Sequence, residues 1–138
     1  MLMPMGIGVS RKPQKFVGKE NAEILTISNR TATLAYTDLD LTAYTSPNAK
    51  YAKIGGMINV DSVTAGANNQ ACLSLRKNGT TPTWAIVCWV DGGVQVAGSR
   101  VYFSAMVEMD SGQVIEYGIV VSGTIQFDTY MWLEGYIE

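Results

Sequence analysis

The amino-acid sequence predicts an all-β protein, an antiparallel β-sandwich, from three observations. Apolar and polar residues alternate over Val101–Val107, Val114–Val121 and Thr129–Glu138, the period of two expected of strands with one buried face. Turn signals rich in Gly, Asn and Asp recur about every 8–12 residues. No segment keeps the 3.6-residue period of an amphipathic helix. About eight to ten short strands at this spacing favour a sandwich or a barrel.

Length and composition predict one domain that makes contacts with other proteins. The chain has 138 residues, the size of a single domain. Residues 1–20 contain Pro, Gly and four basic residues without a sustained period, so we expect an extended N-terminal arm ahead of a β-sandwich domain at 21–138. Charged residues make up only 16% of the chain, against about 25% in an average soluble domain. Part of the apolar surface is therefore expected to meet another subunit or partner.

The first half of the domain is expected to contain three extended segments. They are Ala22–Ser28, Thr31–Tyr36 and the long segment Ala49–Val60. Gly55-Gly56 in the middle of the third segment predicts either a β-bulge or a close approach of another group to the backbone. Residues 61–70, which include Gly66, Asn68 and Asn69, are expected to form a loop.

The second half begins with a hairpin. Asn78-Gly79, between Ala71–Arg76 and Thr83–Val90, is a strong turn signal, because both residue types tolerate positive φ. The run from Thr83 to Val90 is almost entirely apolar, so we expect a strand buried on both faces, with Trp84 and Trp89 in the core. A further strand is expected at Val94–Val96, and the three alternating segments named first complete the domain.

The residue types present argue against an enzyme. Histidine is absent, which removes the commonest general base and metal ligand as well as Ser/His/Asp and Cys/His nucleophilic sites. Cys72 and Cys88 lie in apolar runs, which favours buried free thiols; a bridge between adjacent strands is the alternative. We therefore predict no enzymatic activity, no cofactor and no metal.

The carboxylates show no catalytic pattern. Asp38 and Asp40 would share one side of a strand, which favours a solvated loop edge over a calcium site. Asp110, beside Ser111-Gly112, is expected to be a turn residue. Glu108, Glu116 and Glu134 alternate with apolar neighbours, so we expect them on outward faces.

The N-terminal arm is the predicted partner-binding segment. It combines flexible apolar residues with basic ones and contains no acid before Glu20. Methionine adapts to irregular grooves, and a basic arm is attracted to an acidic surface. The predicted partner-binding residues are Met1, Leu2, Met3, Met5, Ile7, Val9, Arg11, Lys12 and Lys15. Four cations without interleaved aromatic residues, on a chain of net charge −2, make nucleic acid an unlikely partner, and no apolar stretch approaches the ~18 residues of a membrane helix.

A second candidate surface lies near the C-terminus. Tyr130, Trp132 and Tyr136 would share one face of the last strand. Packing in the core is one interpretation of these residues. A subunit contact or a carbohydrate-binding face is the other.

Four segments, taken in order, resemble tailed-phage virion proteins. They are Thr37–Lys50, with its acidic Asp-Leu-Thr-Ala-Tyr stretch and Pro-Asn turn, the Cys72–Thr80 hairpin, Asp110–Tyr117 and Trp132–Ile137. The resemblance spans residues 37–138 and does not extend to the arm. It implies a jelly-roll-like β-sandwich, as in capsid decoration proteins and phage fibre knobs, and an oligomer, most often a trimer.

These observations lead to three hypotheses of function. The first is a virion structural protein, a capsid-decorating or head-fibre jelly roll that binds the major capsid protein or another virion protein through its arm. The second is a receptor-binding (adhesin) knob of a phage tail fibre. The third is a shell-forming jelly roll whose basic arm faces the genome, for which salt-dependent binding of nucleic acid would be evidence.

Overall fold

The computed structural model describes residues 12–81 and 86–138, and its regular elements there are all β-strands. The strands are β1 (Phe16–Arg30), β2 (Leu34–Asp40), β3 (Tyr51–Val63), β4 (Gly66–Lys77), β5 (Ile86–Gly92), β6 (Arg100–Glu108), β7 (Val114–Ser122) and β8 (Ile125–Ile137). They form two four-stranded sheets in which every pairing is antiparallel. The predicted all-β, antiparallel architecture is confirmed.

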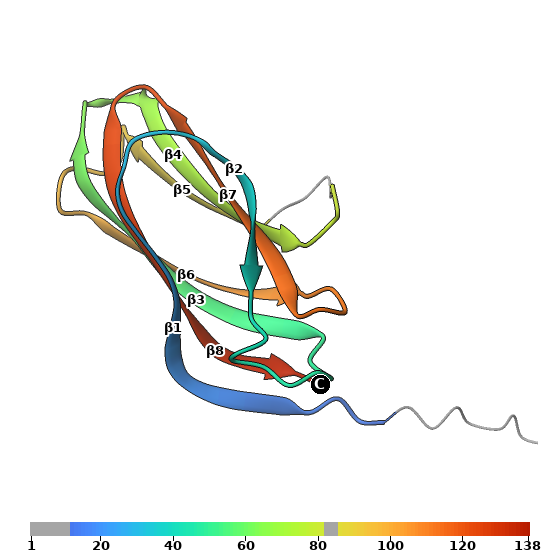
Figure 1. The fold of residues 1–138 in the computed structure, drawn as a ribbon. Helices are drawn as coiled ribbons and strands as arrows, with labels where there is room; N and C mark the ends of the chain where they lie inside the picture. The colour runs from blue at the N-terminus through green and yellow to red at the C-terminus, as the bar shows by residue number, and fades with distance from the viewer. Residues whose placement is uncertain (1–11, 82–85) are drawn as a thin grey trace, which may run out of the picture.

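The two sheets face each other, as Figure 1 shows. Sheet A has the strand order β1-β8-β3-β6, and sheet B has the order β2-β7-β4-β5. Only β4 and β5 are both consecutive along the chain and adjacent in a sheet. Every other connection between consecutive strands crosses from one sheet to the other. Strands that lie side by side are therefore mostly distant in sequence.

One hydrophobic core fills the space between the sheets. Sheet A contributes side chains such as Ile54, Phe127 and Leu133, and sheet B contributes others such as Leu73 and Ile119; all of them belong to the same buried cluster. Along β8, buried and half-buried residues alternate from Ile125 to Glu134, which matches the alternation seen in the sequence. Burying each large aliphatic side chain contributes roughly 1.5–3 kcal/mol to folding.

The first strand begins before the predicted end of the arm. β1 starts at Phe16, and Phe16, Val17 and Gly18 pair with the end of β8. Backbone hydrogen bonds between Lys15 and Glu138 continue this pairing. The arm boundary at residue 20 is therefore wrong, because residues 16–20 belong to sheet A. Residues 1–11 lie outside the described part of the chain.

Two further segment predictions are corrected. The expected loop at residues 61–70 is mostly strand, since β3 extends to Val63 and β4 begins at Gly66. The expected strand at Val94–Val96 is instead part of the turn region that joins β5 to β6. At residues 61–70, pairing with distant strands outweighs the loop-like composition. At Val94–Val96, the backbone N–H groups of Val94 and Gln95 instead donate to Asp91, which closes a turn.

The apolar run after the hairpin is an edge strand. β5 pairs with β4 on one side and is last in the order of sheet B. Trp89 points away from the core and is 54% exposed, so the prediction that it is buried is wrong. Trp84, the other predicted core tryptophan, lies outside the described residues. The turn at Asn78-Gly79 is where it was expected, with φ of 73° at Gly79.

Gly55 and Gly56 allow aromatic rings to lie against β3. A Cβ on Gly55 would overlap the indole of Trp132, and one on Gly56 would overlap the ring of Phe103. The β3–β6 register runs through both glycines without a shift. Of the two predictions for this pair, the close approach is confirmed.

Candidate functional site

The outer face of sheet A holds two of the three aromatic residues predicted to form a contact face. Tyr130 and Trp132 are half-buried on that face, whereas Tyr136 is 7% exposed and belongs to the core cluster. The register between β3 and β8 shifts where Gly135 pairs with Lys53 and Leu133 with Ile54. The extra residue reverses the alternation beyond it, because side chains of a strand alternate with a period of two. The prediction that all three share one face is therefore wrong for Tyr136.

A shallow depression lies between β1 and β8 on this outer face. It has a volume of about 330 Å³ and is lined by Asn21, Glu23, Tyr130, Met131 and Trp132. The register of β1 against β8 shifts on both sides of Ala22 and Glu23, at the edge of the depression. Thr26 donates a hydrogen bond to Glu23 at 2.6 Å, which orients this carboxylate. Aromatic rings beside an amide and a carboxylate can hold a small polar ligand.

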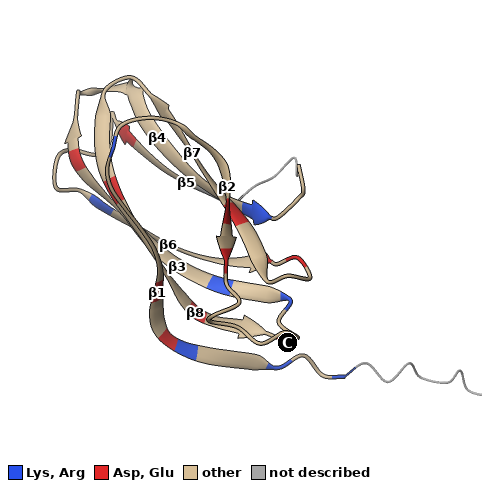
Figure 2. Ribbon diagram, in the orientation of Figure 1, with Lys and Arg blue, Asp and Glu red and all other residues tan. Residues whose placement is uncertain are grey.

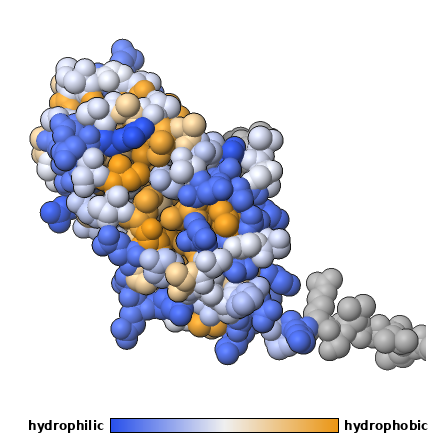
Figure 3. All heavy atoms as spheres, viewed as in Figure 1, coloured by the Kyte–Doolittle hydropathy of each residue, from blue (hydrophilic) through white to orange (hydrophobic). Residues whose placement is uncertain are grey.

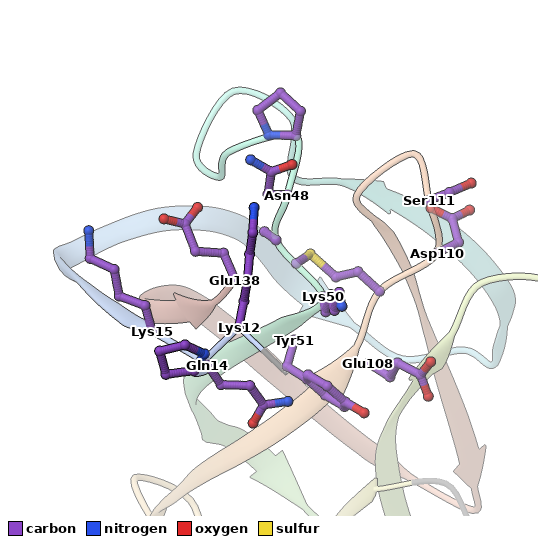
Figure 4. A pocket seen from close by; sticks show the side chains of 14 residues that line it. Lys12, Gln14, Lys15, Asn48, Lys50, Tyr51, Glu108, Asp110, Ser111 and Glu138 are labelled. Atoms are coloured by element: carbon purple, nitrogen blue, oxygen red, sulfur yellow. The ribbon is translucent and has the colours of Figure 1, made fainter. Parts of the chain in front are cut away.

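A larger depression, of about 740 Å³, lies where the chain enters β1. Figure 4 shows Lys15 and Glu138 on one side of it, Glu108 and Asp110 on the opposite side, and Lys12 and Lys50 between them. Lys15 and Glu138 exchange backbone hydrogen bonds of 2.9 and 3.0 Å at its rim. Two residues of the predicted binding arm thus lie at this depression. The others, Met1, Leu2, Met3, Met5, Ile7, Val9 and Arg11, are outside the described residues.

Exposed apolar residues are concentrated on one flank of the sandwich. Eight large apolar side chains are exposed in the described residues, and five of them belong to β5, β6 or the turn between these strands. We call this surface the β5–β6 flank; its five exposed residues are Trp89, Val94, Val96, Tyr102 and Met106. Composition indicated that such a surface exists, but its position depends on β5 and β6 being edge strands on the same side, which the sequence did not show.

The opposite flank, formed by β1 and β2, is interrupted by bulges and charges. Figure 3, which has the orientation of Figure 1, shows apolar residues in the middle of the molecule between blue regions. Half-buried Ile24, Leu25 and Leu34 lie at these two edge strands and pack against the core. β1 also carries Lys19, Glu20, Glu23 and Arg30, and Figure 2 shows charges of both signs along it. Charges and bulges on an edge strand disfavour pairing with another chain.

The outer face of sheet B contains a network that sequence patterns did not reveal. The ring of Tyr36 lies over Gly118, and its hydroxyl accepts a hydrogen bond of 2.8 Å from Ser74. The Arg76 guanidinium lies 3.5 Å from the centre of that ring and pairs with Glu116 at 2.5 Å. A stacked and paired arginine is held in place, so this network fixes β2 onto β7 and β4.

Both cysteines are free. Cys72 pairs in register with Trp89, and Cys88 pairs with Leu73, so the two thiols project from opposite faces of sheet B. Burial, with a smaller contribution from Cys88, raises the pKa of Cys72 to about 11. Burial also raises the pKa of Cys88. The prediction of free thiols is confirmed, but only Cys72 is buried, since Cys88 is half-buried. Neither thiol is activated as a nucleophile, because both pKa values are raised.

The carboxylates singled out from the sequence have structural roles. Asp110 accepts hydrogen bonds from the backbone of Gly112 and Val114, both at 2.9 Å, which confirms it as a turn residue. Burial acts to raise the pKa of Asp110, but these bonds, together with Asn78 and Lys77, leave it below its usual value. Asp40 accepts a bond from the Thr42 backbone, which lowers its pKa. Within residues 12–81 and 86–138, no group of three or more potential metal-ligating side chains is present.

The three outward glutamates each pair with a cation from another strand. Glu134 lies 3.1 Å from Lys53, Glu108 lies 2.7 Å from Lys77, and Glu116 pairs with Arg76. Their outward placement is confirmed. The pairs follow from strand adjacency and thus could not be read from the alternation alone.

Comparison with known proteins gives no identification, because no family model and no curated protein sequence matches the chain. Within the described residues, no helix has the length and apolar character needed to cross a membrane.

Proposed function

We propose that the protein is a virion structural protein, a capsid-decorating or head-fibre jelly roll that binds the shell through its N-terminal segment and self-associates. The order β1-β8-β3-β6 facing β2-β7-β4-β5 supports the jelly-roll part of the proposal. Eight strands in two facing sheets, with most connections crossing between them, are the arrangement of that fold, which occurs in viral capsid and lectin domains. Its assignment to a virion follows from the resemblance of residues 37–138 to tailed-phage virion proteins and from analogy with viral jelly rolls.

The observation that carries the proposal is the β5–β6 flank. Five of the eight exposed large apolar side chains of the described residues belong to the edge strands β5 and β6 or to the turn between them. Exposed apolar side chains gathered along edge strands mark a candidate site of protein–protein contact. A protein that assembles on a repeated surface requires such contacts. The resemblance to virion proteins predicts a trimer.

The segment ahead of β1 is the proposed attachment to the shell. Lys12 and Lys15 lie at the depression near the C-terminus, and the residues before Lys12 include the seven other apolar or basic positions of the predicted arm. Because residues 16–20 belong to sheet A, the proposed attachment segment is 1–15 rather than 1–20. A cationic segment is attracted to acidic surfaces, and its apolar residues would provide buried area to offset roughly 1–2 kcal/mol of lost backbone entropy per ordered residue.

Binding of the truncated chain to capsids tests the proposal. We expect the full chain to co-sediment with purified capsids of the encoding virus that lack this protein, and a chain without residues 1–15 to remain folded and in solution. Lys12→Glu/Lys15→Glu is expected to weaken binding in a salt-dependent manner, whereas Lys53→Glu, on the outer face of sheet A, is the matched control. Undiminished binding of the truncated chain would contradict the proposal.

One observation favours a second function, the receptor-binding knob. The depression bounded by Tyr130, Trp132, Glu23 and Asn21 combines aromatic rings with hydrogen-bonding groups, a combination that suits a saccharide. Under this proposal, the protein binds glycans on an array, and Trp132→Ala abolishes the signal while Trp89→Ala preserves it. No binding to any glycan of the array would contradict this second proposal.

A further inference from the structure

β6 is the last strand in the order of sheet A, and within the described residues it lacks the proline, bulge and central charge that commonly protect an edge strand. β6 pairs with β3 over nine residues, from Tyr51↔Glu108 to Asn59↔Arg100, without a register shift. It contains no proline, and its only charges are the terminal Arg100 and Glu108. By contrast, β1 has three register shifts and β2 has one. An uncharged, regular edge strand is a template for another strand.

The backbone groups available at this edge follow from its pairing with β3. Just beyond the strand ends, Met109 donates to Lys50 at 2.8 Å and Ser99 accepts from Val60 at 2.9 Å, so odd-numbered residues bond to β3. Backbone groups of successive residues in a strand point to opposite sides. The N–H and C=O groups of the even-numbered residues of β6, such as Ser104, therefore point to the free edge.

We propose that β6 pairs antiparallel with β6 of a second copy of this chain, about a two-fold axis at Ser104. Antiparallel pairing about this residue places Arg100 opposite Glu108 of the second copy, twice across the interface. Each oppositely charged pair lies at one end of an otherwise uncharged strand. Pairing displaced by two residues would leave these charges without their partners. The charge pattern therefore specifies both the occupant and the register.

The side chains of the two faces also match under this pairing. On the outer face, Tyr102, which is 64% exposed, lies opposite Met106 of the second copy, a favourable ring–sulfur contact. On the inner face, Phe103 lies opposite Ala105, which sets a large side chain against a small one. Val101, Phe103 and Ala105 are only half-buried although they pack against the core. A second β6 would complete their burial.

The charged groups near the proposed contact are compatible with it. Lys77 approaches Glu108 at 2.7 Å, and both side chains remain largely exposed. A carboxylate can accept hydrogen bonds from two cations, so Arg100 of the second copy would add to this pair rather than compete with it. Asp110 lies near Lys77 and is held by its own turn.

This inference rests on the self-association in the proposed function and narrows it to a two-fold contact. A two-fold contact closes an assembly with an even number of subunits, either a dimer or trimers joined in pairs. A trimer alone is incompatible with it. Attachment to a capsid through residues 1–15 does not depend on the β6 contact. A result that contradicts the β6 contact therefore does not contradict the attachment, and the reverse also holds.

Disulfide trapping tests the pairing and its register. Ser104→Cys places two thiols opposite each other, at a Cα separation of about 5.5 Å that suits a disulfide. Met106→Cys is the control, because the two positions 106 would be separated by about 14 Å along the strands. Under mild oxidation of the full chain, we expect covalent dimers from Ser104→Cys and none from Met106→Cys or the parent chain. Dimers from Met106→Cys, or none from Ser104→Cys, would overturn the proposal.

Charge exchange and mass in solution provide an independent test. By sedimentation equilibrium, we expect an even subunit number, a lower mass for Arg100→Glu, and recovery of the mass in Arg100→Glu/Glu108→Arg. Val120→Lys, an exposed residue on the outer face of sheet B, is the matched control and should leave the mass unchanged. A monomer or a trimer of the parent chain, or an exchange that does not recover, would overturn the two-fold contact.

Discussion

Placing a methyl group on Gly55 should destabilise the protein only while the Trp132 ring is present. The Cβ of Gly55→Ala would overlap Trp132 Nε1, approach its Cε2 to 2.6 Å, and overlap the Glu134 carboxylate. The Glu134 side chain can rotate away from the added methyl group, because its ion pair with Lys53 is partly exposed and contributes only roughly 0–1 kcal/mol to folding stability. The indole is rigid and lies between neighbouring strands, so it must shift. We expect Gly55→Ala to lower the free energy of unfolding by about 1–3 kcal/mol.

Removal of the ring should reverse the sign of this effect. In a Trp132→Ala background, the added methyl group meets no ring, and alanine is favoured over glycine in a strand by roughly 0.5–1 kcal/mol. Gly55→Ala should then stabilise the protein by that amount. The coupling energy between the two positions is thus expected to be about 1.5–4 kcal/mol, which a double-mutant cycle measures by urea denaturation.

The control for this cycle is Gly18→Ala, on the exposed part of β1. A Cβ at Gly18 has Phe16 Cε1 at 3.9 Å as its nearest neighbour, which is an ordinary contact. Its effect should be small and the same in both backgrounds. An equal loss of stability from Gly55→Ala with and without the Trp132 ring would refute the placement of the indole over β3.

Four other outcomes are expected. Phe127→Ala should lower the free energy of unfolding by about 3–5 kcal/mol, because Phe127 is fully buried between the sheets; a loss near zero by urea denaturation would contradict the core assignment. Asp110→Ala should lower the free energy of unfolding by about 1–2 kcal/mol at neutral pH, because the hydrogen bonds from Gly112 and Val114 are lost. Because the pKa of Asp110 is lowered in the folded state, its contribution is present above the unfolded pKa of 3.8 and is lost as the pH falls through the folded value. A difference between parent and variant that persists in acid would contradict this. Asp61→Asn should have the opposite effect: burial, and after it Asp128, raises the pKa of Asp61, and its Oδ2 is buried without a hydrogen-bond partner among the described residues. Charged Asp61 is thus destabilising above its raised pKa, so the variant should be more stable at pH 7, with an advantage that declines as the pH falls below that pKa and is gone below the unfolded value of 3.8. Finally, Cys72 should react slowly with a thiol reagent at pH 8 in the folded protein and rapidly after unfolding, since its pKa is about 11 and it is 6% exposed; fast reaction in the folded state would contradict its burial.

The sequence was sufficient for features that depend on local patterns. Alternation identified the segments of β7 and β8, Asp110 marked the turn between β6 and β7, and Asn78-Gly79 marked the turn after β4. The outward placement of Glu108, Glu116 and Glu134 followed from the same alternation. Each of these is decided by a residue and its close neighbours, because strand side chains alternate and turn residues bond their own backbone.

Features that depend on neighbours distant in the sequence were missed. Alternation placed Tyr136 with Tyr130 and Trp132, but the register shift against β3 turned it into the core. The apolar run containing Trp89 suggested a strand buried on both faces, yet its place at the edge of sheet B leaves the indole exposed. A run of apolar residues indicates how much surface a strand can bury and does not indicate which strands will cover it.

The sequence by itself determined that this chain forms strands, where most of them turn, and that its low charge leaves apolar surface to be covered. Only the tertiary structure decided that β5 and β6 are edges on the same flank, and hence where this surface lies. The physical reason is that all connections except that of β4 to β5 cross between the sheets. Edge positions, registers and pairings such as Arg76 with Glu116 therefore arise from contacts between segments about 40 or more residues apart.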